Sequence, residues 1–261
     1  MISTRALSRR FGAVLAVDAL DLEIAPGEIF GLVGRNGAGK TTTVKMLTTL
    51  LPPTSGTASI DGHDVVREAG AVRRVIGYVP QALSADGELT GYENLLVFAR
   101  LFDIPRAERR RRIDEALAFM DLAGAAGRLV RHYSGGMIRR LEIAQSTLHR
   151  PKVLFLDEPT VGLDPLARHT VWQHLRRLNR DAGTTVVLTT HYMDEAEALC
   201  GRLAILHQGR LAALGPAEEL KARAGAGATL DEAFAHFTGG AERGTGYAGT
   251  AETRRTAGRL G

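Results

Sequence analysis

Residues 27–47, "GEIFGLVGRNGAGKTTTVKML", contain in one stretch the elements around which the rest of the chain can be arranged. Residues 27–34 form a short apolar run that ends in glycine, which is typical of a buried strand. Residues 40–50 are expected to form a helix. Between them, "GRNGAGKT" matches the pattern G-x-x-x-x-G-K-[ST]. A strand before that pattern and a helix after it are the context that a phosphate-binding loop requires.

The residue types in this loop suit the binding of a nucleoside triphosphate. The glycines allow backbone N–H groups to wrap around phosphates, the Lys40 ammonium group faces the outer phosphates, and the Thr41 hydroxyl is a ligand for Mg²⁺. The alternative, a glycine-rich turn with a chance lysine, does not explain the flanking strand and helix. The loop residues predicted to contact ATP are Gly34, Arg35, Asn36, Gly37, Ala38, Gly39, Lys40, Thr41 and Thr42.

A second motif, "VLFLDE" at residues 153–158, is an apolar strand that ends in two acidic residues. Asp157, at the carboxyl end of the strand, is expected to hold Mg²⁺. Glu158, one residue further on, is expected to polarise the water that attacks the phosphate. Acidic residues also occur in ordinary turns at strand ends. Together with the phosphate loop, however, this pair predicts hydrolysis or transfer of a nucleotide phosphate.

The rest of the chain predicts an α/β fold. The alternation in "AVLAVDALDLEI" and the Asp61-Gly62 turn in "TASIDGHDV" predict an N-terminal antiparallel β subdomain. Further strands are expected at residues 75–81, 153–157 and 184–190. Helices are expected near 165–181 and 193–200, and a hairpin over "LAILHQGRLAALG". Short apolar strands that alternate with helices predict a mainly parallel sheet covered on both faces.

The composition of successive segments predicts how the chain is divided. Residues 88–150 are mainly helical and are expected to form a subdomain inserted into a nucleotide-binding domain that covers residues 1–238. Within it, Arg109–Arg112 are expected on a solvated helix face, with Glu108 and Arg112 four residues apart. Contact with anionic lipid is the alternative for this run. Residues 239–261 contain almost no large apolar side chain, so we expect a disordered tail.

The overall composition excludes several classes of protein. Of the 261 residues, 44% are hydrophobic and 24% charged, as in ordinary globular proteins. A net charge of +4 does not argue for a nucleic-acid partner, and we expect none. The single cysteine, Cys200, cannot form an internal disulfide, which favours a reducing cytoplasm. No apolar run is long enough to span a membrane, and "MISTRALSRRFGAV" is not expected to be a secretion signal.

The stretch "YSGGMIRRLEIAQS" at residues 133–146 predicts a second phosphate-binding segment. Ser134, Gly135 and Gly136 directly precede residues that recur at helical spacing. Backbone N–H groups that are left free at such a helix start form an anion-binding end. The chain therefore has two predicted phosphate-binding segments, far apart in the sequence.

Taken in order, "SGGMIRRLEIAQ", "LFLDEPTVGLDP" and "VVLTTHYMDEAE" resemble the motifs of the nucleotide-binding subunits of ABC transporters. The resemblance extends from about residue 2 to residue 238. It implies that Phe11 stacks on adenine, for which a core position is the alternative. It also implies that Gln81 reaches Mg²⁺ and communicates with the membrane partner. Ser134–Gly136 match the signature segment of the family, Asp164 matches the dimer-contact loop, and His191 matches the histidine that contacts the γ-phosphate.

The family explains why one chain has two phosphate-binding segments. Its subunits stack head to tail, and the signature segment of one subunit closes on the γ-phosphate that the other subunit holds. The resemblance therefore implies ATP and Mg²⁺ as ligands, a homodimer or heterodimer of ATPase subunits, and a separate transmembrane permease. Such a subunit is expected in the cytoplasm, attached through its permease to the cytoplasmic face of the cell membrane.

Within the family, this chain resembles the ATPases of daunorubicin-resistance-type exporters. The segments "YSGGM", "LGPAEEL" and "TLDEAFAHFTG" are similar to theirs. Tyr133 and Met137 depart from the commonest signature, and Met137 cannot form the hydrogen bonds of the glutamine amide that it replaces. We therefore expect an ATPase subunit that drives export of a drug, an antibiotic or a lipid-like substrate.

Three alternatives remain at this point. An importer-type subunit would have the same motifs. A soluble ABC ATPase acting in translation or DNA repair would usually carry two cassettes, long coiled coils or a zinc insert, and none of these is evident in the sequence. A small-molecule kinase with a phosphate loop would have no use for Ser134 or Asp164.

Overall fold

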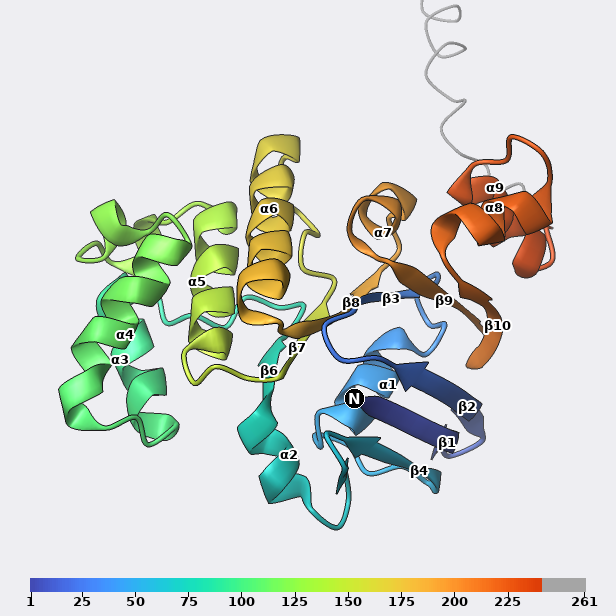
Figure 1. The fold of residues 1–261 in the computed structure, drawn as a ribbon, viewed down its shortest axis with the longest axis horizontal. Helices are drawn as coiled ribbons and strands as arrows, with labels where there is room; N and C mark the ends of the chain where they lie inside the picture. Colours follow the sequence, from blue (N-terminus) through green and yellow to red (C-terminus); the bar gives the residue numbers. More distant parts are fainter. Residues whose placement is uncertain (241–261) are drawn as a thin grey trace, which may run out of the picture.

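The computed structural model describes residues 1–240 and contains a six-stranded sheet next to a four-stranded one (Figure 1). The larger sheet has the order β10-β9-β3-β8-β7-β6, in which β9 to β6 run parallel and β10 pairs antiparallel with β9. Its strands are β3 (Ile29–Val33), β6 (Ile76–Val79), β7 (Val153–Asp157), β8 (Thr185–Thr190), β9 (Arg202–His207) and β10 (Arg210–Gly215). The predicted mainly parallel sheet is confirmed. Of the expected tail, residues 241–261 lie outside the described part of the chain.

The smaller sheet is antiparallel and is formed near the N-terminus, as predicted. Its order is β2-β1-β4-β5. Asp61 and Gly62, with φ of 52° and 84°, form the tight turn between β4 and β5. Positive φ at both central residues is what a type I′ hairpin turn requires, and Asp-Gly supplies it readily. The strands are β1 (Ile2–Phe11), β2 (Val14–Ile24), β4 (Ser55–Ile60) and β5 (His63–Asp64).

The helices form distinct groups around the two sheets. Helices α3, α4 and α5 pack against one another at one end of the molecule, while α8 and α9 pair at the other end beside β10 (Figure 1). Helices α2, α8 and α9 were not expected from the sequence. The helix bounds are α1 (Lys40–Leu47), α2 (Ala69–Val75), α3 (Gly91–Leu101), α4 (Arg106–Phe119), α5 (Gly135–Thr147), α6 (Pro165–Ala182), α7 (Met193–Leu199), α8 (Ala217–Ala224) and α9 (Leu230–Phe237).

The run of arginines on α4 forms ion pairs along its own helix, as the spacing predicts. Arg112 lies 2.8 Å from Glu108, and Arg111 lies 2.8 Å from Glu115. Such pairs at a surface stabilise a helix only slightly. They nevertheless show that part of the positive charge of this run is balanced locally.

Two hydrophobic clusters lie on the two faces of the larger sheet. One contains Phe30, Phe155 and Val187 from the sheet together with Val44 and other apolar residues of α1 and the smaller sheet. The other joins the opposite face to α3–α7. Strands β7 and β8 are buried along their whole length. Polar residues at their carboxyl ends are therefore held by rigid, dry strands.

The register of the parallel strands brings three chain segments to the same edge of the sheet. Val33 at the end of β3 is opposite Thr190 at the end of β8, and Asp157 at the end of β7 is opposite Thr189. The phosphate loop, the acidic pair and the segment before His191 consequently begin side by side. This edge is where ligands bind in open parallel sheets.

Within residues 1–240, no helix is both long enough and apolar enough to cross a lipid bilayer.

Candidate functional site

The loop between β3 and α1 has the backbone shape of a phosphate cradle. Gly37 and Gly39 have φ of 82° and 102°, a region that favours glycine. A Cβ at Gly39 would lie 2.6 Å from the Ala16 carbonyl oxygen, and one at Gly34 would lie 2.7 Å from the Leu206 carbonyl oxygen. Gly39 is the N-cap of α1 and offers no side-chain oxygen to its first N–H groups. Those groups and the positive end of the helix dipole are therefore available to an anion.

Lys40 and Glu158 form a buried ion pair at the centre of the site. The Lys40 ammonium lies 3.2 Å from Glu158 Oε1, and the two side chains are only 4% and 6% exposed. Lys40 also donates hydrogen bonds to the carbonyl oxygens of Gly34 (2.7 Å) and Arg35 (3.3 Å). All of these partners accept rather than donate hydrogen bonds, so an incoming phosphate would compete with them for the same ammonium group.

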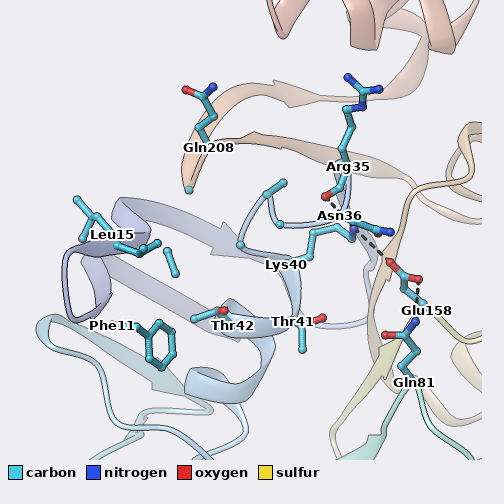
Figure 2. Close-up of a pocket in the computed structure, with 16 residues that line it drawn as sticks. Phe11, Leu15, Arg35, Asn36, Lys40, Thr41, Thr42, Gln81, Glu158 and Gln208 are labelled. Carbon is cyan, nitrogen blue, oxygen red and sulfur yellow. Dashed lines mark hydrogen bonds and ion pairs between the residues drawn. The ribbon is translucent and has the colours of Figure 1, made fainter. Parts of the chain in front are cut away.

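Glu158 also lies next to two other predicted site residues. The Gln81 side-chain amide donates to Glu158 Oε2 at 3.3 Å, and His191 Nδ1 lies 3.3 Å from the same oxygen. Figure 2 shows Lys40 and Gln81 both directed at this carboxylate. Glu158 thus connects residues that come from the phosphate loop, from the segment after β6 and from the segment after β8.

The backbone of Glu158 is held in an unusual conformation. Its φ is 49°, which is uncommon for a residue other than glycine. Its N–H is bonded to the carbonyl oxygen (3.1 Å) and to the hydroxyl (3.0 Å) of Thr189. Backbone strain of this kind costs about 1–3 kcal/mol and gathers at functional sites. Here it turns the carboxylate from the end of β7 into the site.

Asp157 and Thr41 lie next to each other and offer oxygens to a metal ion. The Thr41 hydroxyl donates to Asp157 Oδ1 at 3.1 Å, and the Thr189 hydroxyl donates to the same oxygen at 2.6 Å. Residues 1–240 contain no group of three or more His, Cys, Asp or Glu side chains that could hold a metal by themselves. A hydroxyl with one carboxylate fits Mg²⁺ bound together with nucleotide phosphates.

The negative charge of Asp157 also acts on a neighbouring side chain. Burial, together with this charge, raises the pKa of Tyr78 to about 12.

A cavity of about 710 Å³ opens in front of these groups (Figure 2). Phe11 lies in its wall and is 45% exposed, so it is not a core residue. The cavity is lined by Phe11, Val14, Leu15, Ala16, Arg35, Asn36, Gly37, Ala38, Gly39, Lys40, Thr41, Thr42, Gln81, Glu158, Gln208 and Gly209. The predicted loop residues, Phe11, Gln81 and Glu158 are thus brought together, with Gly34 and Asp157 directly behind them.

Part of this wall comes from the turn between β9 and β10, which the sequence did not indicate as part of the site. Gly209 has a φ of 81°, its N–H donates to the Ala38 carbonyl oxygen at 3.2 Å, and its own carbonyl accepts from the Asp18 N–H at 2.8 Å. These bonds hold the neighbouring residue Gln208 beside the phosphate loop. The hairpin was predictable from "HQGR". Its position over the loop was not, because it depends on the pairing of β9 with β3.

The remaining predicted residues do not line this cavity. Ser134 is the N-cap of α5, and its hydroxyl accepts from the Met137 N–H at 3.3 Å. Asp164 is the N-cap of α6 and accepts from the Ala167 N–H at 2.9 Å. A Cβ on Gly136 would lie 2.8 Å from Ala167 Cβ, so the two helix starts are in close contact. Ser134–Gly136 and Asp164 therefore form a second group, separate from the phosphate loop of the same chain.

The fold and the first group of residues define a phosphate-loop nucleotide hydrolase. Comparison with known families makes this more specific. Residues 17–161 match the family model described as ABC transporter. The chain therefore belongs to the ABC transporter family, as an ATP-binding subunit of the ATPase type.

Named relatives cover most of the chain. It is 49% identical to the daunorubicin resistance ATP-binding protein DrrA3 of Streptomyces coeruleorubidus, over 86% of this chain and 71% of that protein. It is 43% identical to the Nod factor export ATP-binding protein I of Cupriavidus metallidurans, over 84% of this chain and 72% of the relative. One name refers to daunorubicin resistance and the other to export, in agreement with the resemblance that the sequence motifs indicate.

Solved structures agree with the fold. One described as an ATP-binding subunit of an ABC transporter superposes with a TM-score of 0.81 at 31% identity, covering 91% of this chain and 99% of its own. Another, an ATP-binding cassette dimer in a post-hydrolysis state bound to ADP and phosphate, gives 0.73 at 28% identity, covering 83% and 98%.

Proposed function

We propose that this chain hydrolyses ATP to drive the export of a drug, an antibiotic or a lipid-like substrate through a separate membrane permease. The observation that carries the catalytic part is the position of Glu158, held at the end of β7 between Lys40 and His191. The relatives' names support the exporter part. Residues 1–238 would form one nucleotide-binding domain, with residues 88–150 as its helical subdomain.

The phosphate loop would bind and orient the triphosphate. Backbone N–H groups at the start of α1 and the Lys40 ammonium would contact its outer oxygens, and Phe11 would stack on the adenine base. Thr41, Asp157 and Gln81 offer a hydroxyl, a carboxylate and an amide oxygen that would hold Mg²⁺, which when bound neutralises charge on the phosphates. Stacking needs an accessible aromatic face, and Phe11 presents one at the cavity wall.

Glu158 would act as the general base. A γ-phosphate that takes over Lys40 would release the carboxylate from its ion pair, leaving it free to accept a proton from the attacking water. His191, 3.3 Å from the same carboxylate, would donate a hydrogen bond to the γ-phosphate. Gln81, also 3.3 Å from it, would help to orient the water. ATP entry would in this way assemble the catalytic arrangement.

The residues outside the cavity would serve the site of a second subunit. Ser134–Gly136 and Asp164 lie together at two helix starts but line no part of their own chain's nucleotide cavity. In a head-to-tail dimer, N–H groups of Ser134–Gly136 would contact the γ-phosphate held by the partner. All the motifs are present in one chain, so a homodimer could contain two complete sites, although a heterodimer would use the same contacts.

The permease would contact a groove between the sheet and the helical subdomain. A cavity of about 230 Å³ there is lined by Leu50, Ile76, Phe98 and Phe102 among others. Leu50 is 61% exposed, and Leu101, next to Phe102, is 70% exposed. Exposed apolar side chains around a groove favour a protein partner. Because the groove adjoins β6, which leads directly to Gln81, it could report permease contact to the site. The subunit would then sit on the cytoplasmic face of the membrane.

Membrane fractionation tests whether the chain attaches to the membrane through a permease. The chain is expected to sediment with membranes only when it is expressed with its permease. Leu50→Glu should lower that recovery about tenfold, because a charge in a buried contact weakens it, while ATP binding stays unchanged. Val66→Glu is the matched control, since Val66 is similarly exposed (55%) but does not line the groove. Stable binding of the purified chain to anionic vesicles would contradict the proposal and favour the lipid contact of Arg109–Arg112.

A further inference from the structure

Helix α5, which begins at the signature segment, contains a buried pair of opposite charges. Arg139 and Glu142 are one helical turn apart, and each side chain is 2% exposed. Arg139 Nη1 lies 3.0 Å from Glu142 Oε2. Placing two charges in a dry interior is costly, and an ion pair alone often fails to offset that cost. The pair must therefore be explained by the other groups that it contacts.

Both charged groups bind the chain segment that carries Gln81. The Arg139 guanidinium donates to the carbonyl oxygens of Pro80 and Gln81, each at 2.7 Å. Glu142 Oε1 accepts hydrogen bonds from the N–H and the hydroxyl of Ser84. The two side chains thus hold residues 80–84 from both ends. Charge-assisted bonds of this kind are short and strongly directional.

The same face of α5 is fixed to the strand that precedes this segment. The Ser146 hydroxyl donates to the Tyr78 carbonyl oxygen at 2.9 Å. A Cβ on Gly77 would lie only 2.2 Å from the Ser146 carbonyl oxygen, so helix and strand are in direct backbone contact. Contacts therefore continue along α5 from β6, through residues 80–84, to the helix start at Ser134. Within residues 80–84, the Gln81 side-chain amide donates to Glu158 at 3.3 Å.

We propose that Arg139 and Glu142 are positioning residues that clamp the Gln81 segment to the signature helix. A displacement of the Ser134 end of α5, such as closure on a partner's nucleotide, would then be passed to the Gln81 amide and to Glu158. This inference rests on the proposed roles of Gln81 and Glu158 and adds a physical link between the two phosphate-binding groups. A rigid connection with directional bonds is suited to that task.

A purely structural role for the pair would predict a different set of contacts. The next residue, Arg140, is an example of such a role. Its guanidinium donates to the carbonyl oxygen of Met120, at the end of the neighbouring helix α4, at 2.8 Å. Arg139 and Glu142 instead form hydrogen bonds with residues 80–84, which do not belong to a helix. Arg140 therefore provides a matched control on the same helix.

The test replaces both charges by apolar side chains of similar size in the full chain. Arg139→Met combined with Glu142→Leu leaves no unpaired charge, so folding should be retained. The affinity for ATP should stay unchanged. The kcat for ATP hydrolysis should fall about 10- to 100-fold, because Gln81 is no longer held in position. Hydrogen exchange should become faster at the Ser84 amide, while global unfolding stays unchanged. Arg140→Met should leave kcat within about twofold of wild type.

A double-mutant cycle separates positioning from general weakening. Gln81→Ala should lower kcat by a similar factor, and adding it to the Arg139→Met and Glu142→Leu variant should cause no further loss. Should the apolar variant not fold, Arg139→Lys replaces it, since an ammonium group cannot bind both carbonyl oxygens as the guanidinium fork does. It should give a smaller loss, again with no added effect of Gln81→Ala.

The proposal would be overturned if the losses in kcat from Gln81→Ala and from the Arg139 and Glu142 substitutions multiplied. It would also be overturned by an unchanged kcat in the Arg139 and Glu142 variants, or by an equal loss in Arg140→Met. It also falls if Gln81→Ala alone hydrolyses ATP at the wild-type rate, in which case Glu158 can still be the base. A failure of the proposed function looks different, because Glu158→Gln would then retain full hydrolysis. The two failures are therefore distinguishable.

Discussion

Glu158 shows how much of the site depends on one residue. Its strained φ of 49° and its bonds to Thr189 direct the carboxylate toward Lys40, Gln81 and His191. The sequence predicted each of these partners as a site residue. It could not predict that all three surround the same carboxylate. Such convergence depends on the register of β3, β7 and β8, which pattern reasoning does not specify.

A second buried glutamate allows a prediction about pH. Glu195 on α7 is fully buried, and Oε1 accepts hydrogen bonds from the Thr160 hydroxyl (2.8 Å) and from Trp172 Nε1 (3.0 Å). Burial raises the pKa of this carboxyl, opposed by these hydrogen bonds and by the charge of Arg168. A raised carboxyl pKa means that the folded state holds its proton more tightly than the unfolded state does. Its contribution to stability is complete below pH 4.5 and is lost as the pH rises through the folded-state pKa.

Glu195→Gln should therefore raise the melting temperature at about pH 8, by roughly 2–4 °C for each kcal/mol gained. The amide oxygen can still accept the bonds from Thr160 and Trp172, and no charge has to be buried. The gain should shrink toward pH 4.5, where the wild-type carboxyl is protonated in both states. Thermal unfolding across this pH range provides the measurement. A gain that does not vary with pH would show that burial of this charge is not the cause.

At the scale of elements, the sequence predicted those with a strong pattern. The phosphate-loop helix, the buried strands β7 and β8, and the hairpin at Asp61-Gly62 are where they were expected, with helix and strand ends that differ by a few residues. Helices α2, α8 and α9 were missed. Each has only seven or eight residues, too few for a clear helical period, so tertiary packing has to stabilise them. Residues 75–81 were expected to be one strand, but Val75 ends α2 and β6 covers only Ile76–Val79.

The contact between the starts of α5 and α6 provides a prediction at this scale. Gly136→Ala would place a methyl group 2.8 Å from Ala167 Cβ, so the two helices must separate. Overpacking of this kind typically costs about 1–3 kcal/mol. Adding Ala167→Gly should restore much of the stability, because it removes the atom that clashes. It also keeps the backbone N–H of residue 167, which donates to the N-cap side chain of Asp164. Chemical denaturation of the single and double variants measures both effects.

Gly70→Ala is the control for that pair of variants. Gly70 lies in α2, and a Cβ there would meet no atom within 4 Å, so the substitution should be neutral or slightly stabilising. If Gly136→Ala is equally harmless, the close approach of α5 and α6 is not a constraint. The glycine would then be explained by phosphate binding alone.

At the scale of the whole molecule, the predicted site residues fall into two separate groups. The cavity lined by the phosphate loop contains neither Ser134–Gly136 nor Asp164, although all of them are predicted to act on the same reaction. The proposed head-to-tail dimer would account for this, because each chain would supply one half of each site. The solved dimer of a relative with ADP and phosphate is consistent with such an arrangement.

A variant that binds ATP but cannot hydrolyse it should trap this dimer. Glu158→Gln keeps the shape of the side chain but is not a base at neutral pH, and loss of a positioned base typically lowers the rate about 10²- to 10⁴-fold. ATP binding should survive, because Lys40, Thr41 and Asp157 are unchanged. The ATP-bound dimer should then accumulate and be visible by gel filtration with light scattering.

Two further substitutions establish what holds that dimer together. Adding Ser134→Arg should abolish it, since a bulky side chain would occupy the place where the partner's γ-phosphate must sit. Adding Lys40→Ala should abolish it for a different reason, because the cation that faces the outer phosphates is gone and ATP no longer binds. Only the Ser134→Arg variant should still bind ATP as a monomer. A dimer that persists in Ser134→Arg would show that the signature segment does not contact the partner's nucleotide, and the shared-site arrangement would then be wrong.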